Sequence, residues 1–478
     1  MSLARDLYIG GEWVPAEGDK RFAVLDPGNA ETIAEVADAS PADGRRALDA
    51  AVSAQESWAS TSPRDRGELL RRAFDLLTAR SEEFATLMTR EMGKPLAEAR
   101  AEVAYGAEFL RWFSEEAVRI TGRYGDNPAG TGKIVVSHRP VGPCFLITPW
   151  NFPLAMATRK IAPALAAGCT VVVKPAAPTP LTTLAFVRLL EEAGLPAGVV
   201  NVIPTSQSSA VSAPIISDPR LRKLSFTGST NVGRALMRQA AEGILRTSME
   251  LGGNAPFVVF EDADLDEAVA GALVAKFRNV GQACTAANRF IVHAEVAGEF
   301  ATRLAAHVAA MRVGHGLESG TVIGPLIDEG AVASAAELVR DAVERGADLL
   351  AGGHPINRPG AYFEPTVLTN VGPGTRLLSE EIFGPVLAIS TFTSEDEAIS
   401  LANDTEYGLA SYVYTRDLGR AHRMIDLLAT GMMGINAGAI SDAAAPFGGI
   451  KMSGLGREGS VEGIHEYLDL KYSFIPNL

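Results

Sequence analysis

Apolar segments of strand length alternate with segments of helix length between residues 144 and 250. The expected strands are 144–148, 170–173, 199–203, 221–227 and 246–250. Strands that are apolar throughout and are separated by helices indicate a parallel sheet with both faces covered. The sequence therefore predicts a doubly wound α/β fold, in which ligands bind beyond the carboxyl ends of the strands.

A chain of 478 residues is too long for a single hydrophobic core, so more than one domain is expected. Residues 41 to about 122 have helical periodicity, and a second α/β unit is expected to start near Asn254. Extended segments flank these units, and we expect them to pair with each other or with a neighbouring subunit. The predicted division is a first α/β domain (1–122 and 141–252), a second (253–440) and a bridging element (123–140 and 458–478).

Composition and charge exclude several classes of function. The net charge of −14 argues against nucleic acid or an anionic membrane surface as the main partner. The first eight residues lack the apolar core of a signal peptide, and the uncharged stretch 161–173 is too short to span a bilayer. Three widely spaced cysteines and seven histidines without ligand spacing predict no disulfide framework and no metal. We therefore expect a cytoplasmic protein.

One cysteine lies in a segment rich in hydrogen-bonding groups. Cys284 is in the segment 277–289, and it comes 34 residues after Glu250, which opens a Glu-Leu-Gly-Gly motif. A thiolate attacks electrophilic carbon, and a positioned carboxylate activates the water that later releases the product. From these residues alone, the simpler interpretation is that Cys284 is a small buried apolar residue, as a lone cysteine usually is. Cys144 and Cys169, each at a predicted strand, are interpreted as core residues.

Three further motifs follow predicted strands. Asn151 lies among two prolines and two aromatic residues in 148–153, and a fixed amide stabilises a developing oxyanion. Lys174 ends a strand where a ribose or a phosphate could meet it. Ser229 lies in a strand-turn-helix segment, 226–233, whose helix N-terminus offers free N–H groups to a phosphate. Each motif alone has a simpler interpretation as a turn former, a solvated lysine or an ordinary connection.

Taken together, these motifs resemble the aldehyde dehydrogenase superfamily over nearly the full length of the chain. The matching segments, in the order and spacing of that family, are 148–153, 174–175, 226–228, 250–253, 281–284, 381–385, 446–449 and 453–458. The resemblance implies a cofactor domain, a catalytic α/β domain and a small β element for oligomerisation. It also implies a homodimer or a homotetramer.

The resemblance implies catalytic roles by position. Cys284 would be the nucleophile, Glu250 the general base for deacylation, and Asn151 with the backbone N–H of Cys284 the oxyanion hole. Glu458 matches a second glutamate that is thought to relay protons. Relatives that transfer the acyl group to coenzyme A lack a carboxylate at the position of Glu250, so hydrolysis is expected here.

The resemblance also implies a nicotinamide cofactor. Lys174 and Glu381 would bind ribose hydroxyls, Ser229 would lie near the pyrophosphate and Phe383 beside the nicotinamide. The full set of expected cofactor residues is Thr148, Trp150, Lys174, Ala177, Gly228, Ser229, Glu381 and Phe383. Many NAD-specific relatives have a glutamate where this chain has Ala177. Without that carboxylate a 2′-phosphate is not repelled, so we predict that NADP is accepted and preferred over NAD.

Two arginines and a serine near the expected site indicate a small anionic aldehyde as the substrate. Arg159 follows Asn151 by a helical turn or two, Arg278 comes six residues before Cys284, and Ser441 supplies a hydroxyl. Arginine pairs bidentately with carboxylates. The same trio resembles that of succinate-semialdehyde dehydrogenases, although both arginines could instead be structural ion-pair partners.

Several alternatives remain open at this point. The substrate could be glutarate or 2-oxoglutarate semialdehyde, or the enzyme could have broad specificity. A non-catalytic relative and a cofactor-independent thioester hydrolase are rivals from other classes. Some close relatives have a second cysteine two residues after the nucleophile, but this chain has Ala286 there, so we expect no disulfide switch.

Overall fold

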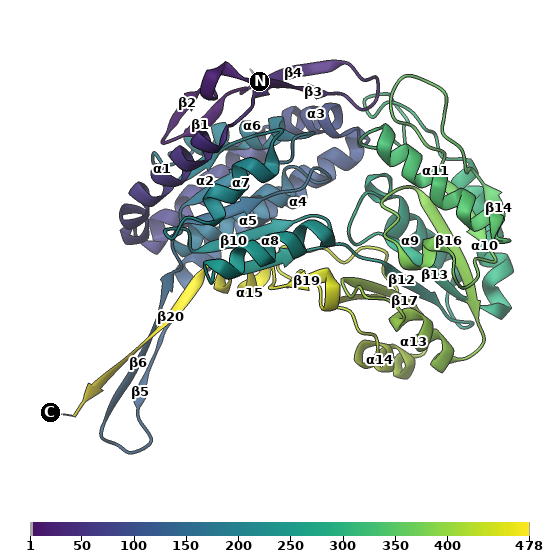
Figure 1. The fold of residues 1–478 in the computed structure, drawn as a ribbon. Helices are drawn as coiled ribbons and strands as arrows, with labels where there is room; N and C mark the ends of the chain where they lie inside the picture. The colour runs from purple at the N-terminus through teal and green to yellow at the C-terminus, as the bar shows by residue number, and fades with distance from the viewer. Residues whose placement is uncertain (1–2, 478) are drawn as a thin grey trace.

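The computed structural model describes residues 3–477 and contains two large sheets, a projecting three-stranded arm and a small N-terminal hairpin (Figure 1). The order of the first sheet is β19-β11-β10-β7-β8-β9-β1-β2. Its strands are β1 (Leu7–Ile9), β2 (Glu12–Val14), β7 (Cys144–Ile147), β8 (Val171–Lys174), β9 (Val200–Val202), β10 (Lys223–Thr227), β11 (Arg246–Glu250) and β19 (Gly454–Leu455).

The central strands β7 to β11 of this sheet are parallel, and β7 lies between β8 and β10. The chain therefore winds to one side of β7 through β8 and β9, and to the other side through β10 and β11. The strand order reverses at β7, and such a switch point leaves a crevice at the carboxyl ends of the strands. The predicted doubly wound α/β fold is confirmed.

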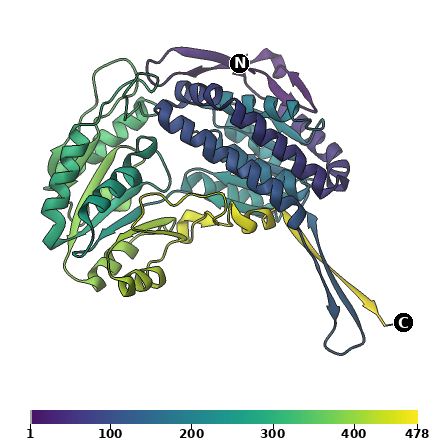
Figure 2. The ribbon, with the colours of Figure 1, turned by 180° about the vertical axis from the view of Figure 1, so that it is seen from behind.

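Helices cover both faces of the first sheet. They are α1 (Pro41–Ser60), α2 (Pro63–Ala79), α3 (Ser81–Met92), α4 (Leu96–Glu116), α5 (Ala155–Ala167), α6 (Pro180–Glu192), α7 (Ser208–Ile216), α8 (Thr230–Glu242) and α15 (Ser460–His465). Phe145 packs on the face of α1, α7 and α8, whereas Leu146 packs on the face of α5 and α6. Successive strand residues point to opposite faces, so both must be apolar. Figure 2 shows the long helices α2, α3 and α4 lying side by side over the second of these faces.

The second sheet has the order β14-β15-β16-β13-β12-β17-β18. Its strands are β12 (Ala255–Val259), β13 (Ala287–His293), β14 (Asp348–Ala351), β15 (Thr366–Thr369), β16 (Val386–Phe392), β17 (Ala410–Tyr414) and β18 (Met432–Ile435). The accompanying helices are α9 (Leu265–Phe277), α10 (Ala294–Ala309), α11 (Glu329–Glu344), α12 (Arg376–Ser379), α13 (Glu395–Asn403) and α14 (Leu418–Leu427). Phe257 packs on one face with α9 and α10, and Val258 on the other with α13 and α14.

The two extended segments seen in the sequence pair with each other. β20 (Leu468–Pro476) is antiparallel to β6 (Gly132–Pro140) along its whole length, and β5 (Arg123–Asp126) lies on the other side of β6. This arm projects from the body of the molecule (Figure 1). A separate hairpin joins β3 (Arg21–Leu25) to β4 (Thr32–Ala37), and the sequence pattern did not predict it.

Candidate active site

The carboxyl ends of β7, β10 and β11 open into a pocket of about 210 Å³ that faces the second sheet. Segments far apart in the sequence meet there. Of the residues that the sequence singled out, the pocket wall contains Cys284, Glu250, Asn151, Trp150, Gly228, Ser229, Glu381 and Phe383. The predicted nucleophile, base and oxyanion donor therefore share one cavity with most of the predicted cofactor residues.

The loop that carries Cys284 has an unusual backbone. After α9 ends at Phe277, Asn279, Val280 and Gly281 have φ values of 57°, 59° and 74°. A β-branched valine rarely adopts this left-handed region, and such strain persists only where the surroundings enforce it. Cys284 follows three residues later with its side chain half-buried.

The electrostatic surroundings of Cys284 hold it as a thiol. Burial raises its pKa to about 12, and the nearby Arg159 guanidinium opposes this shift. Burial disfavours the thiolate because a charge in low dielectric loses its hydration. A base or an additional positive charge must therefore assist deprotonation at neutral pH.

Glu250 is the last residue of β11 and is only 2% exposed. Neither of its carboxylate oxygens has a hydrogen-bond partner among residues 3–477. Burial raises its pKa well above the usual range, and the charge of Glu458 raises it further. An unpartnered buried carboxyl group in the wall of a pocket is suited to exchange a proton with whatever enters that pocket.

Glu458 has the opposite environment. Its Oε1 accepts a hydrogen bond from Lys160 Nζ at 2.5 Å, and its Oε2 lies 2.5 Å from Arg159 Nε. Burial acts to raise the pKa of Glu458, but the two cations outweigh it and lower the pKa. Lys160 also donates to Ser225 Oγ at 2.8 Å. The two neighbouring glutamates therefore have opposite pKa shifts, lowered for Glu458 and raised for Glu250.

The two arginines predicted to bind the substrate lie beside the pocket, but they differ in their ion pairing. Arg159, on α5, is 1% exposed, and besides its ion pair with Glu458 it lies 4.1 Å from the ring centre of Phe447. Arg278 is half-buried, lies 5.5 Å from the ring centre of Phe152, and forms no ion pair with any carboxylate in the described part of the chain. Arg278 is therefore the arginine whose charge is available to a ligand.

The structure adds Tyr105 of α4 to this cluster. Its hydroxyl is buried without a hydrogen-bond partner among the described residues. Burial raises the pKa of Tyr105, while Arg159, Arg278 and Ser441 act to lower it, so the phenol lies within electrostatic range of all three. Sequence reasoning missed Tyr105 because nothing in the helical pattern of α4 separates it from an ordinary core residue.

The predicted cofactor residues surround the same crevice. The Trp150 and Phe383 rings meet edge to face at 5.4 Å. Ser229 is the N-cap of α8, and its side chain does not cap the helix, which leaves first-turn N–H groups for an anion. Burial raises the pKa of Glu381 to about 7. A Cβ on Gly252 would lie 2.7 Å from Glu381 Oε2, so a larger residue at 252 would displace this carboxylate.

Lys174 ends β8, as expected, and its side chain donates to Ser208 Oγ at 3.0 Å. Burial lowers its pKa to about 8. Ala177 lies half-buried in the turn after β8, and Thr148 binds the Lys174 carbonyl through its backbone N–H at 3.2 Å. Ser208 begins α7, and sequence reasoning missed it because the pairing of Lys174 with α7 depends on the fold. A lysine and a hydroxyl side by side, without a carboxylate at 177, fit a phosphate-bearing nicotinamide dinucleotide.

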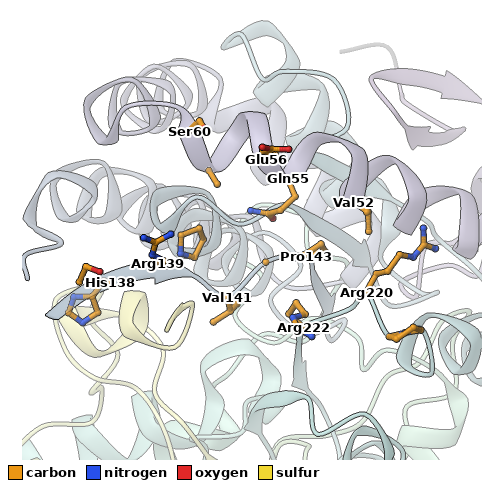
Figure 3. A pocket seen from close by; sticks show the side chains of 15 residues that line it. Val52, Gln55, Glu56, Ser60, His138, Arg139, Val141, Pro143, Arg220 and Arg222 are labelled. Atoms are coloured by element: carbon orange, nitrogen blue, oxygen red, sulfur yellow. The ribbon is translucent and has the colours of Figure 1, made fainter. Parts of the chain in front are cut away.

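A larger hollow, of about 790 Å³, lies at the base of the arm between α1 and the end of β6 (Figure 3). It is open to solvent, and residues such as Glu56, Arg139 and Arg222 line it. None of the residues that the sequence singled out for chemistry lines this hollow. The smaller pocket beside Cys284 is therefore the candidate active site.

Residues 3–477 lack two kinds of feature. They contain no group of three or more His, Cys, Asp or Glu residues arranged to hold a metal ion. No helix in that part of the chain has the length and apolar character needed to cross a membrane.

Comparison with known proteins agrees with this geometry. The model of the "Aldehyde dehydrogenase family" matches residues 13–473. The chain belongs to the aldehyde dehydrogenase family. The succinate-semialdehyde dehydrogenase of Paenarthrobacter nicotinovorans is 60% identical over 440 residues, which cover 92% of this chain and 98% of that protein.

Two further members of the family are informative. The glutarate-semialdehyde dehydrogenase of Pseudomonas putida is 50% identical over 97% of this chain and 96% of that protein. The crystal structure of an NADP-dependent enzyme of Escherichia coli superposes with a TM-score of 0.98 at 47% identity, over 99% of this chain and 98% of that one.

Proposed function

We propose that this aldehyde dehydrogenase oxidises succinate semialdehyde to succinate with NADP as its preferred cofactor. The observation that carries the proposal is the cluster of Arg278, Tyr105 and Ser441 beside Cys284. Arg278 forms no ion pair with a described carboxylate, and the Tyr105 hydroxyl is an unpaired buried group. These groups would pair with a carboxylate at the far end of a short aldehyde.

In the proposed mechanism the Cys284 thiol gives its proton to solvent water, and the resulting thiolate adds to the aldehyde carbon. The Asn151 amide and the backbone N–H of Cys284 donate to the oxyanion of the tetrahedral adduct. A nicotinamide cofactor, when bound, supplies the acceptor for the hydride that this adduct loses on becoming a thioester. Glu250 then takes a proton from water, which hydrolyses the thioester and frees Cys284. Glu458, close to Glu250 and to the cations Arg159 and Lys160, would relay that proton.

The proposed preference for NADP rests on the residues at the end of β8, where the adenosine ribose would bind. Lys174 would meet the adenosine ribose and its 2′-phosphate, with Ser208 as a further donor. Ala177 brings no negative charge there. Thr148, Trp150, Gly228 and Ser229 would contact the remainder of the cofactor, Glu381 the nicotinamide ribose and Phe383 the nicotinamide.

A longer or more polar anionic aldehyde is the second candidate substrate. The 50% identity to a glutarate-semialdehyde dehydrogenase favours glutarate semialdehyde, which carries one more methylene between its two ends. A single methylene changes binding by only about 1–3 kcal/mol, so both aldehydes can be substrates of one pocket.

We further infer the roles of the larger parts of the chain. Residues 1–122 and 141–252 would bind the cofactor, residues 253–440 would supply the nucleophile, and residues 123–140 and 458–478 would join subunits into a dimer or a tetramer. Exposed apolar side chains on the arm, Leu470, Tyr472 and Phe474, support subunit association. The few, widely spaced cysteines support a cytoplasmic location.

A substrate panel tests the proposal. Absorbance at 340 nm is followed with succinate, glutarate and 2-oxoglutarate semialdehydes and with butanal, each with NADP and with NAD. We expect the highest kcat/KM for succinate semialdehyde with NADP. Equal kcat/KM values for butanal and the semialdehydes would exclude the carboxylate pocket, and turnover without cofactor would indicate a simple hydrolase.

A further inference from the structure

Asn151 and Cys284 belong to separate segments whose relative position must be fixed. Asn151 follows β7, whereas Cys284 follows α9, and the two come from different sheets. If both act on one carbonyl group, as the proposed function requires, their separation must be held to within a fraction of an ångström. A network of buried polar groups on and near α4 joins the two segments.

The main-chain carbonyl oxygen of Asn151 accepts two hydrogen bonds. Lys94 Nζ donates to it at 2.8 Å, and Asn279 Nδ2 donates at 3.0 Å. Lys94 is completely buried, and its ammonium also lies 4.1 Å from the ring centre of Phe152. A buried lysine is costly unless it is paired and hydrogen-bonded, and here its partners include the turn that carries Asn151.

Asn279 connects that turn to the nucleophile loop. Its Nδ2 also donates to the Gln282 carbonyl oxygen at 2.9 Å, and Asn151 Nδ2 donates to the same oxygen at 3.0 Å. Two amide groups and two carbonyl groups therefore form a closed ring of hydrogen bonds. Gln282 lies two residues before Cys284, so this ring reaches the nucleophile.

Two glutamates of α4 anchor the ring. Glu98 Oε2 accepts from the backbone N–H of Asn279 at 2.6 Å. Glu102 forms the ion pair with Lys94, and its Oε1 accepts from the backbone N–H of Leu154 at 2.9 Å. The contacts to Asn279 hold one residue of the left-handed segment 279–281, a backbone conformation that needs enforcement from its surroundings.

We propose that Lys94 and Asn279 are positioning residues that hold the Asn151 amide at a fixed distance from Cys284. Neither side chain lines the pocket or touches a reacting atom. They act through the Asn151 carbonyl, so removing either would lower the rate of chemistry by displacing the oxyanion donor.

A double-mutant cycle tests this role. Lys94→Met is compared in the wild type and in Asn151→Ala, which keeps the main-chain carbonyl but lacks the amide that is positioned. We expect Lys94→Met to lower kcat about 10- to 100-fold in the wild type, with an unchanged KM for the cofactor, and by less than about threefold in Asn151→Ala. Equal fold losses in both backgrounds would overturn the proposal.

Controls separate positioning from a general loss of stability. Lys223→Met removes another fully buried lysine, on β10, and its effect on kcat should be the same in both backgrounds. Asn279→Gly removes the second donor, keeps a residue suited to positive φ and leaves the Lys94–Glu102 pair intact. If Lys94→Met does not fold, the same cycle with Asn279→Gly tests the proposal. We again expect a larger fall in kcat in the wild type than in Asn151→Ala.

Alkylation of Cys284 by iodoacetamide adds an independent readout, because this reaction forms no oxyanion. Its rate should stay within about twofold of the wild type in Lys94→Met and Asn279→Gly. If the alkylation rate falls by the same factor as kcat, the network acts on the reactivity of Cys284. That result would overturn the role in positioning Asn151. An unchanged kcat in Asn151→Ala itself would instead refute the oxyanion role in the proposed function.

Discussion

Arg159 Nε lies 2.5 Å from Oε2 of Glu458, in an ion pair whose two side chains are almost completely buried. The sequence pattern assigned both Arg159 and Arg278 to a substrate carboxylate, and the structure places the two arginines in different surroundings. Truncating one partner of a buried pair leaves the other charge uncompensated, so a variant of Arg159 would affect Glu458 as well as any ligand. Arg278 is the cleaner probe of substrate recognition.

Arg278→Ala should raise KM for succinate semialdehyde about 10- to 100-fold, because a hydrogen bond to a charged group is worth about 1.5–3 kcal/mol. The KM for butanal, which has no carboxylate, should change little. Tyr105→Phe is the matched variant and should have a smaller effect in the same direction. Equal changes in KM for the two aldehydes would contradict the carboxylate pocket.

Glu250→Gln should lower steady-state kcat about 10²- to 10⁴-fold, the usual contribution of a general base. Formation of the thioester does not need this base in the proposed mechanism. Rapid mixing should therefore still show one equivalent of reduced cofactor per active site, followed by slow turnover. If no burst of reduced cofactor is seen, Glu250 acts at or before the loss of the hydride.

Glu458→Gln should move the acid limb of the kcat–pH profile to lower pH. The charge of Glu458 helps to raise the pKa of Glu250, and Glu250 must be ionised to act as a base. Removing that charge lowers the pKa of Glu250, so more of the enzyme is active at a given acidic pH. The profile is compared with the wild type at temperatures where both are folded, and a limb displaced to higher pH would refute this coupling.

Ala177→Glu should change the cofactor preference. A carboxylate at 177 would repel a 2′-phosphate and could bind ribose hydroxyls, so kcat/KM should fall at least about tenfold for NADP and rise for NAD. Ser208→Ala should weaken NADP alone, through loss of one donor beside Lys174. A wild-type enzyme with a tenfold preference for NAD would overturn the argument from Ala177.

The parallel strands β7 to β11 of the first sheet were predictable to within a residue or two, because strands covered on both faces are mostly apolar and alternate with helices, whereas the short antiparallel strands β1 and β2 were missed. β19 was not predictable, since Gly454 and Leu455 form a two-residue strand without a pattern. It nevertheless pairs with Met249 and Glu250 and so places the segment of Glu458 beside the site. The β3–β4 hairpin, whose strands lack a clear apolar run, was missed for a similar reason.

The motif residues around Cys284 were predictable because their segments together resemble those of a known family in order and spacing, although each segment alone has a simpler interpretation. Tyr105, Ser208 and Lys94 were not, since only the packing of α3, α4 and α7 against the crevice brings them near it. The raised pKa values of Cys284 and Glu250 also escaped prediction, because both shifts originate mainly in burial that a linear sequence does not reveal. The roles of all these residues stay predictions until the variants are measured.

The pairing of β20 with β6 and of β19 with β11 has a consequence for synthesis of the protein. A nascent chain leaves the ribosome from its N-terminus, so β6 and β11 emerge long before residues 454–476 are translated. Until then the arm lacks a strand and one edge of the first sheet is open, and unpaired strand edges favour aggregation. Slow translation of the final third of the message should therefore reduce the yield of folded enzyme. A transcript that lacks only the codons for residues 454–478 should reduce it more than the small number of missing residues suggests.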